Sequence, residues 1–467
     1  MTTLTERYNP AFFERMIYAL GIILLIPVAA ALALGREYII WYYAASVVAS
    51  ILIAFPRVCL YLFLLSVSVF MPYYIGRAGI HPFDICFFIL AASLCLGFLL
   101  RGQSHIVVTP IDRYFRLLIA ATVLSAVFAF DVSYSIVPCA RIVVVFIAFR
   151  IVYGFALELG PRRLVSFYIY HVFVLSLINL ALFLKSGGQV RIFGPAWLAF
   201  ETYSMTALPM ALAFLLWAER PAEKIKYGAI GLTIGLALLA TQSRAPLLAV
   251  LIAVPVLLAA AYWKTSAGKR TSFLSVLRKA AIPTTIMLII AILLRETLLQ
   301  GLFVRVESFI EALKHPQETV YLRMVLWTAA LKAFAANPIT GVGIGNFKIV
   351  GQVVAEMKFS PVWYYISGMS AHNVILHYMA ETGILGTLSV VALAGVNLRI
   401  AFRSLKRSVS APELQMSAAN FMAIFVFCVT IFYMRAWTWG QGGYIMALLF
   451  AFSVAWNYTL ERKRKLS

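Results

Sequence analysis

Residues 245–263 read APLLAVLIAVPVLLAAAYW, an apolar run without a charged side chain. As a helix rising about 1.5 Å per residue, such a run is long enough to cross the hydrocarbon core of a bilayer. Backbone polar groups inside a bilayer must bond within a helix or a closed barrel, and this run lacks the alternation of a barrel strand. It therefore predicts a transmembrane helix.

Runs of this kind recur along the whole chain. Hydrophobic residues fill 63% of the 467 positions and charged residues only 12%, which a soluble domain could not sustain without large exposed apolar patches. We expect an all-α, polytopic integral membrane protein, with residues 1–467 as a single transmembrane domain of about 12–14 transmembrane helices. The predicted spans are 16–34, 38–55, 58–75, 82–100, 113–130, 134–157, 164–185, 200–218, 226–241, 245–263, 280–298, 373–399, 415–434 and 440–458.

The charge distribution predicts the orientation. The chain holds 39 Lys and Arg against 18 Asp and Glu, a net charge of +21. The basic residues gather in alternate loops, which the positive-inside rule assigns to the cytoplasm together with both termini. Because these loops are short and flank helices, they fit anionic membrane lipids as partners and argue against nucleic acid. The clusters are Arg113 and Arg116, Arg162 and Arg163, Arg220 to Lys226, Lys264 to Lys279, Arg399 to Arg407 and Arg462 to Lys465.

Residues 299–372 interrupt the alternation of spans and short loops, on the side that the topology places outside. A segment of this length is ordinarily functional or disordered. The stretch YLRMVLW from Tyr321 opens a helical pattern that stops at Asn337-Pro338. The next residues, GVGIGN at 341–346, predict a turn-rich connection in which Gly343 and Gly345 let the backbone approach a ligand or another helix closely. We therefore expect an ordered, partly helical periplasmic segment.

Two histidines stand at the end of this segment. Ser370-Ala371-His372-Asn373 leads into the span 373–399, and His377 and Glu381 follow on the same helix. Because an imidazole ordinarily titrates near pH 6.5, a histidine at the membrane boundary can accept a proton at working pH. His372 is therefore the candidate catalytic base, against the alternative of a polar residue that merely holds a helix end. His377 lies deeper and either supports the site or packs.

Arginines on the outer side are a second signal, because positive charge there is what the topology rule disfavours. Guanidinium groups bind phosphate oxygens bidentately, which suits a diphosphate ligand. The alternative is snorkelling of the side chain to lipid headgroups, an explanation that is strongest for Arg141. The four candidates are Arg191 in the loop GGQVRIFGP at 187–195, Arg244 in the tight turn TQSR, Arg141 near the outer end of the span 134–157, and Arg323.

Metal and disulfide chemistry is not expected. The five cysteines all fall inside apolar runs and none belongs to a C-x-x-C pair, so neither a zinc site nor a disulfide framework is predicted. The outer segment also lacks a D-x-D-like acidic motif. Arginines would then replace a metal ion as the group that holds a phosphate-bearing substrate.

In order and spacing, these motifs resemble the O-antigen ligase and polymerase superfamily of envelope glycosyltransferases, over roughly residues 190–390. After Gly194 an Asn-Pro-Asn-like stretch is common in the family, and this chain instead has Pro195 to Tyr203. The matching elements are Arg191-Ile192-Phe193-Gly194, Ser243-Arg244, Arg323 to Trp327, Asn337-Pro338 with 341–347, Ala371-His372-Asn373, and Glu381-Thr382-Gly383-Ile384-Leu385-Gly386.

The resemblance implies a GT-C-like, metal-independent, inverting glycosyltransferase without a cofactor, acting on the periplasmic face of the bacterial inner membrane. Its donor would be a glycan on undecaprenyl diphosphate. His372 would take the proton of the acceptor hydroxyl, and Arg191 and Arg244, with Arg141 and Arg323, would bind the diphosphate. Asn373, Gly343, Gly345 and His377 would support the site.

The acceptor stays open. Lipid A–core as acceptor would make the protein an O-antigen ligase of lipopolysaccharide biosynthesis, which we favour slightly. A second lipid-linked repeat unit would make it a Wzy-type polymerase of O antigen or exopolysaccharide. From a different class, a flippase or transporter of lipid-linked oligosaccharide is also a large basic helical protein, but it would leave the outer segment without a purpose.

Overall fold

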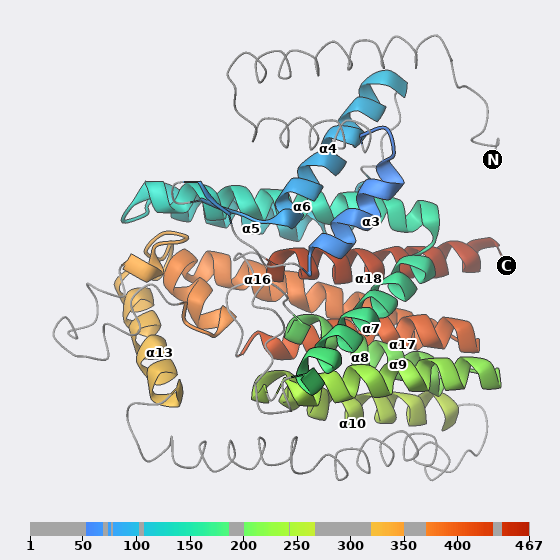
Figure 1. Ribbon diagram of the computed structural model, residues 1–467. Coiled ribbons are helices and arrows are strands. Elements are labelled where there is room, and N and C mark those ends of the chain that lie inside the picture. Colours follow the sequence, from blue (N-terminus) through green and yellow to red (C-terminus); the bar gives the residue numbers. More distant parts are fainter. Residues whose placement is uncertain are drawn as a thin grey trace, which may run out of the picture. The chain divides into compact units, whose positions relative to one another are not determined.

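The computed structural model describes residues 53–68, 73–75, 78–101, 107–185, 200–241, 243–266, 319–349, 370–432 and 441–466, and these are almost entirely helical (Figure 1). Contacts divide the chain into two units: Met1–Ser66 with Pro82–Ser104, and Val67–His81 with His105–Ser467. The predicted all-α fold is confirmed. The predicted spans 16–34, 38–55 and 280–298 lie outside the described residues.

The first unit contains α3 (Pro56–Ser66) and α4 (Pro82–Arg101), which pack along each other. The Phe63 and Phe87 rings lie 6.0 Å apart between them. The predicted span 58–75 is wrong in its second half, because α3 ends at Ser66. Tyr73–Ile75 (β1) instead pairs antiparallel with Ala78–Ile80 (β2), a hairpin that belongs to the second unit. Hydropathy misses this change, since aromatic and β-branched residues are as apolar in a strand as in a helix.

The second unit is a bundle of long helices. Among the described residues, a helix lies at each predicted span from 113–130 onward, although several helices run further at their basic ends than hydropathy predicts. A helix can continue past the hydrocarbon, where charged side chains are solvated. The helices are α5 (Asp112–Val127), α6 (Val132–Leu159), α7 (Pro161–Lys185), α8 (Phe200–Leu216), α9 (Pro221–Ala240), α10 (Arg244–Ser266), α13 (Thr319–Ala336), α16 (Val374–Arg407), α17 (Ala411–Thr430) and α18 (Gln441–Leu466).

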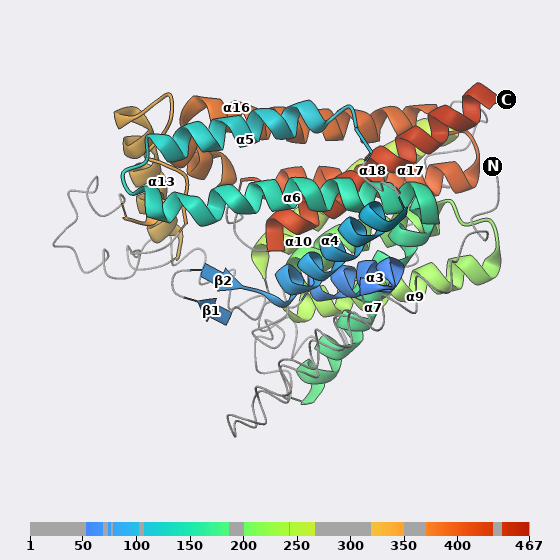
Figure 2. The ribbon, with the colours of Figure 1, turned by 90° about the horizontal axis from the view of Figure 1, so that it is seen from above.

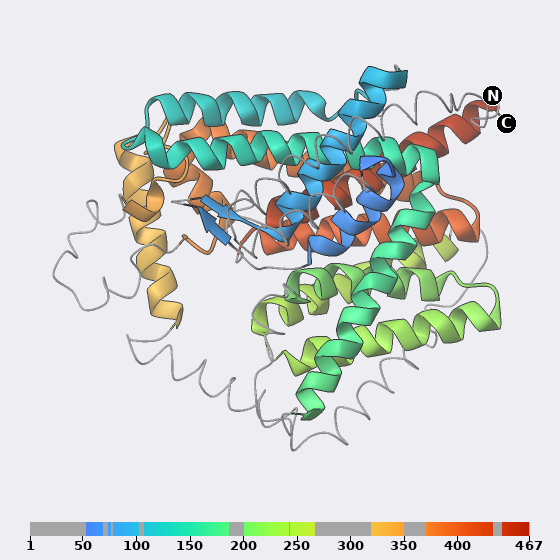
Figure 3. The same cartoon turned by 45° about the horizontal axis from the view of Figure 1, so that its top comes forward.

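By length and composition, seven of the described helices could cross a membrane. They are α4, α6, α7, α10, α16, α17 and α18, whereas α8 is apolar but shorter. Within the second unit α6 packs along α18, α8 along α9 and α17, and α16 along α5 and α17. Helices α5 and α6 also run side by side, as Figures 2 and 3 show. Small buried residues on α8 and α17, among them Ala211 and Ala418, let neighbouring helices approach closely.

Basic side chains hold one end of this bundle. Lys264 Nζ at the end of α10 donates to the carbonyls of Lys406 (2.7 Å) and Ser408 (3.0 Å) at the end of α16. Lys463 Nζ on α18 pairs with Glu413 Oε1 at the start of α17, 2.6 Å away. The ends of α10, α16 and α18 and the start of α17 therefore meet at this basic end.

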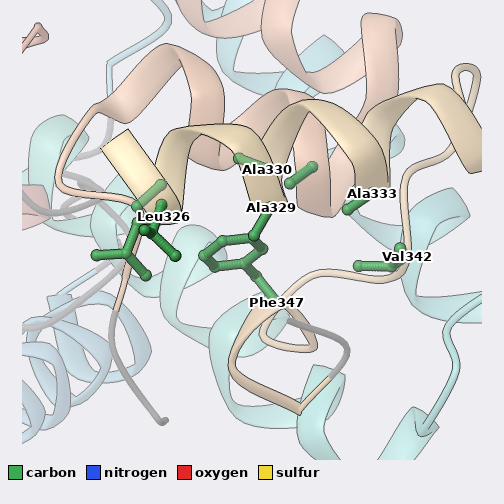
Figure 4. Packing of buried hydrophobic residues seen from close by; sticks show 9 residues of the cluster. Leu326, Ala329, Ala330, Ala333, Val342 and Phe347 are labelled. Atoms are coloured by element: carbon green, nitrogen blue, oxygen red, sulfur yellow. The ribbon is translucent and has the colours of Figure 1, made fainter. Parts of the chain in front are cut away.

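Helix α13 belongs to the opposite end, where it runs across the direction of the long helices (Figure 1). Its buried face carries Val325, Leu326, Ala329, Ala330 and Ala333. Val342 and Phe347 from the following loop belong to the same apolar cluster (Figure 4). Alanines leave room for the Phe347 ring, so the loop lies directly against the helix. The helix ends at Ala336, just before Asn337-Pro338, as predicted.

Candidate functional site

A buried loop of residues 341–347, here called the glycine loop, forms the centre of the candidate site. Gly341, Gly343 and Gly345 have φ angles of 68°, 104° and 81°, in the region that only glycine adopts without strain. A side chain on Gly341 would collide with the backbone of Glu381, and one on Gly343 with Ala129. The predicted close approach of this backbone to other helices is confirmed.

The glycine loop is bonded to an interruption in α16. The amides of Val342 and Gly343 donate to the carbonyls of Ala380 (2.9 Å) and Glu381 (3.0 Å), and Ile384 N donates to Pro338 O (2.8 Å). Gly383 at that point has φ 61° and ψ −158°, which is not helical. The interruption frees backbone groups of α16, and the glycine loop and Pro338 satisfy them. Irregular backbone inside a membrane protein is tolerated where its polar groups are bonded to other parts of the protein in this way.

Asn346 fastens the other side of the loop to the turn between α5 and α6. Its Oδ1 accepts from Asp131 N (2.8 Å), and its Nδ2 donates to Asp131 O (3.1 Å) and to Ser135 Oγ (2.9 Å). Ser125 Oγ on α5 receives the amide of Ile344 (2.9 Å) and donates to Glu381 O (2.7 Å). One loop thus joins α5, α6, α13 and α16.

Residues 370–373, here called the His372 turn, lead into α16. His372 is the single non-glycine residue with positive φ (49°) in the part of the chain that the structure describes. Such a conformation costs on the order of 1–3 kcal/mol and persists where surrounding contacts impose it. Trp327 Nε1 on α13 donates to Ala371 O (3.0 Å), and Val374 N donates to Ile431 O at the end of α17 (2.8 Å). Asn373 caps α16 by accepting from Leu376 N (3.0 Å).

Below this turn lies a buried pair of polar side chains. His377 Nε2 approaches Glu381 Oε2 to 3.3 Å, and the two side chains are 1% and 2% exposed. Glu381 Oε1 also accepts from Phe347 N (3.3 Å), and His377 Nδ1 accepts from Ala371 N (3.5 Å). The pair therefore links the glycine loop to the His372 turn. His372 itself is half-buried, which leaves part of its side chain accessible.

The four predicted arginines lie in different parts of the chain, and the structure describes three of them. Arg191 lies outside the described residues. Arg244 opens α10 after the predicted tight turn, in which Ser243 N donates to Thr241 Oγ1 (3.2 Å). Arg323 is half-buried on α13, one turn before Trp327, and residues with this spacing share a helix face. Arg323 therefore lies on the side of α13 from which Trp327 contacts the His372 turn. Arg141 is half-buried in the third turn of α6.

Sequence reasoning missed the part that α5 and α6 play in the site. Ser125 and Ser135 stand in apolar runs and are fully buried, and both bond to the glycine loop. Each was a small polar residue inside a predicted span, a weak signal because serine commonly bonds to its own helix. Within the described ranges, no group of three or more His, Cys, Asp or Glu side chains is arranged to hold a metal ion.

Fold and site together define a polytopic helical membrane protein whose buried polar residues converge where α5, α6, α13 and α16 meet. Residues 229–391 match the family model described as O-antigen ligase. These residues, about a third of the chain, are similar to that family, and the resemblance to the superfamily is confirmed. The match covers most of α9, α10, the glycine loop, the His372 turn and Gly383, but not Arg191. No curated protein matches the chain. The family match and the apolar helices indicate a glycosyltransferase-like enzyme of a bacterial membrane.

Proposed function

We propose that this protein transfers a glycan from undecaprenyl diphosphate to a hydroxyl of lipid A–core at the periplasmic face of the inner membrane. The single observation that carries the proposal is the His372 turn. A partly exposed histidine is held in a strained backbone conformation by bonds from separate helices, within the residues that match the O-antigen ligase family. Strained residues of this kind cluster at active sites.

The orientation of the bundle supports the periplasmic side. Lys264, Arg407 and Lys463 lie at the end where α10, α16 and α18 finish, whereas His372 precedes the opposite end of α16. By the positive-inside rule the basic end faces the cytoplasm. His372 then faces the periplasm, the side on which the proposed transfer takes place. On the same argument the C-terminus, which follows the basic end of α18, is cytoplasmic.

In the proposed reaction His372 acts as the general base. Its imidazole takes the proton of the acceptor hydroxyl as the oxygen attacks the anomeric carbon and the bond to the lipid diphosphate breaks. One direct displacement inverts the anomeric configuration. His377, although close in sequence, is 1% exposed and so is not available to the acceptor.

The departing diphosphate gains negative charge, which Arg191 and Arg244 would stabilise without a metal ion. Arg244 is the first residue of α10, and the free amides of a helix N-terminus favour anions. Arg323 and Arg141 are secondary candidates for the same role. Gly343, Gly345 and Asn373 would shape the site, since each has a backbone or capping role that another residue type would disturb.

The test uses two substitutions, His372→Ala and Arg244→Ala. Each should abolish long surface glycan while lipid-linked intermediates accumulate, because one removes the base and the other a charge that stabilises the leaving group. The measurement is gel analysis of surface glycan and of lipid intermediates at matched expression. Trp263→Phe, at the basic end of α10, is the control and should make normal glycan. Normal glycan from both test variants would overturn the transferase mechanism.

The same gel separates the two products. Loss of a ligase leaves polymerised glycan on undecaprenyl diphosphate, whereas loss of a polymerase leaves single repeat units. Single repeats would therefore replace the ligase by the polymerase of O antigen or exopolysaccharide, with the same residues in the same roles.

A further inference from the structure

Glu381 has several buried contacts that the proposed reaction does not use. Its carboxylate accepts from Phe347 N (3.3 Å) and faces His377 Nε2 (3.3 Å). Its own carbonyl accepts from Gly343 N (3.0 Å) and from Ser125 Oγ (2.7 Å). The side chain is 2% exposed, so it is shielded from solvent and substrate alike. Buried carboxylates are costly and persist where their contacts serve a purpose.

The carboxylate reaches the His372 turn through His377. Ala371 N donates to His377 Nδ1 (3.5 Å), and Nε2 on the other side of the same ring faces Glu381 Oε2 at 3.3 Å. The Phe347 ring stands edge-on to the same imidazole, with centroids 5.5 Å apart. The imidazole orientation is thereby set from two directions, by a carboxylate and by an aromatic ring of the glycine loop.

Ala371 is the residue immediately before His372, and both of its backbone polar groups are held. Its amide is bonded to His377 and its carbonyl to Trp327 Nε1. A left-handed conformation at a non-glycine residue relaxes unless its neighbours prevent it. The two bonds on Ala371 therefore constrain the direction in which His372 leaves the backbone.

We propose that Glu381 is a positioning residue, which acts through His377 and Ala371 to hold the imidazole of His372 against the acceptor hydroxyl. This inference rests on the proposed function, in which His372 is the base. Glu381 touches no reacting atom. It fixes the His377 ring, and the ring fixes the amide that precedes His372, in the way that outer residues orient the ligands of a metal site.

The experiment measures kcat and KM of the purified, full-length protein in nanodiscs, with an undecaprenyl-diphosphate-linked glycan as donor. Glu381→Gln should lower kcat by about 10- to 100-fold, the range seen when orienting partners are removed. KM for the donor should stay unchanged, since Glu381 does not contact it. Ser389→Ala is the matched control, because Ser389 is buried on the same helix and donates to Leu385 O of its own helix (2.8 Å), away from the glycine loop. Its kcat should equal that of the wild type.

Two substitutions of His377 distinguish its contact with Ala371 N from its contact with Glu381. His377→Asn keeps an acceptor at the position of Nδ1 for Ala371 N, whereas His377→Gln keeps a polar group only at the position of Nε2. We expect His377→Gln to lose more of kcat than His377→Asn. Because Glu381 acts through the ring, adding Glu381→Gln to His377→Gln should cost little more than His377→Gln alone.

Failure of this inference is distinguishable from failure of the proposed function. If His372→Ala retains wild-type kcat, the proposed function is wrong. If His372→Ala is inactive but Glu381→Gln has wild-type kcat, the positioning role is wrong and the function stands. Multiplying effects in the double variant would also overturn it. If Glu381→Gln does not fold, as judged by thermal unfolding, the order of the two His377 variants decides: equal losses, or a larger loss for Asn, would contradict the proposal.

Discussion

At the scale of single residues, the site depends on glycines, which have no side chain, as much as on polar side chains. Gly343 and Gly383 each combine a positive φ with a neighbouring atom so close that an added Cβ would collide with it. Asn346 is the complement, since one amide side chain bonds the backbone of Asp131 in both directions and also bonds Ser135. Substitution at either kind of position should disturb more than one helix.

Gly343→Ala provides the sharpest test of this packing. The φ of 104° and the collision with Ala129 each cost on the order of 1–3 kcal/mol, so we expect a marked fall of the thermal unfolding midpoint in detergent and loss of surface glycan. Gly395→Ala is the control, because a methyl group on this α16 glycine would meet no other part of the described chain within 4 Å. It should be neutral or stabilising by up to about 1 kcal/mol. A stable, active Gly343→Ala would show that the loop tolerates a shift.

At the scale of elements, α13 and α16 cooperate across the His372 turn. Helix α13 buries an apolar face beneath the glycine loop and contributes one polar contact, from Trp327 to Ala371. Helix α16 begins at the turn and is interrupted at Gly383, so His377 and Glu381 lie in its short N-terminal part. The loop can therefore align this N-terminal part without bending the long part that follows Gly383.

Trp327→Phe tests the contact between α13 and the turn. Phenylalanine keeps the aromatic bulk but removes the indole N–H, which leaves Ala371 O without this donor. One hydrogen bond contributes about 1 kcal/mol, and we expect kcat to fall by up to about 10-fold while the unfolding midpoint changes little. Trp263→Phe, whose ring stacks on Phe402 with centroids 5.9 Å apart, should leave kcat unchanged. Equal kcat in both variants would show that the bond from Trp327 to Ala371 does not contribute to the reaction.

Hydropathy predicted most of the described helices, because every one of them has to match lipid or another apolar helix. It failed at 58–75, where a strand pair is as apolar as a helix would be. The motifs predicted α13, its end at Asn337-Pro338, and the turn before Arg244. The motifs could not predict which residues far apart in the sequence form hydrogen bonds with each other. Ser125 meets Glu381 and Ser135 meets Asn346, and no local pattern relates residues so far apart.

At the scale of the whole molecule, the proposal depends on which side of the membrane each bundle end faces. Exposed positions exist at both ends, Val132 at the start of α6 and Ser410 before α17. In a variant without the five native cysteines, a thiol reagent that does not cross the inner membrane should label Val132→Cys in intact spheroplasts. Ser410→Cys should react only after lysis. The reverse pattern would place the His372 turn in the cytoplasm and contradict the proposed function.

Synthesis of the chain proceeds from the N-terminus, so α5 and α6 are made long before residues 341–384 exist. Ser125 and Ser135 must wait for partners that lie 219 and 211 positions later. In the interval a serine hydroxyl can bond to a carbonyl of its own helix three or four residues back, and can exchange that bond when the loop arrives. The two serines therefore suit the unfinished protein as well as the finished one, and a nascent chain released before Gly383 would hold a complete α5–α6 hairpin but no active site.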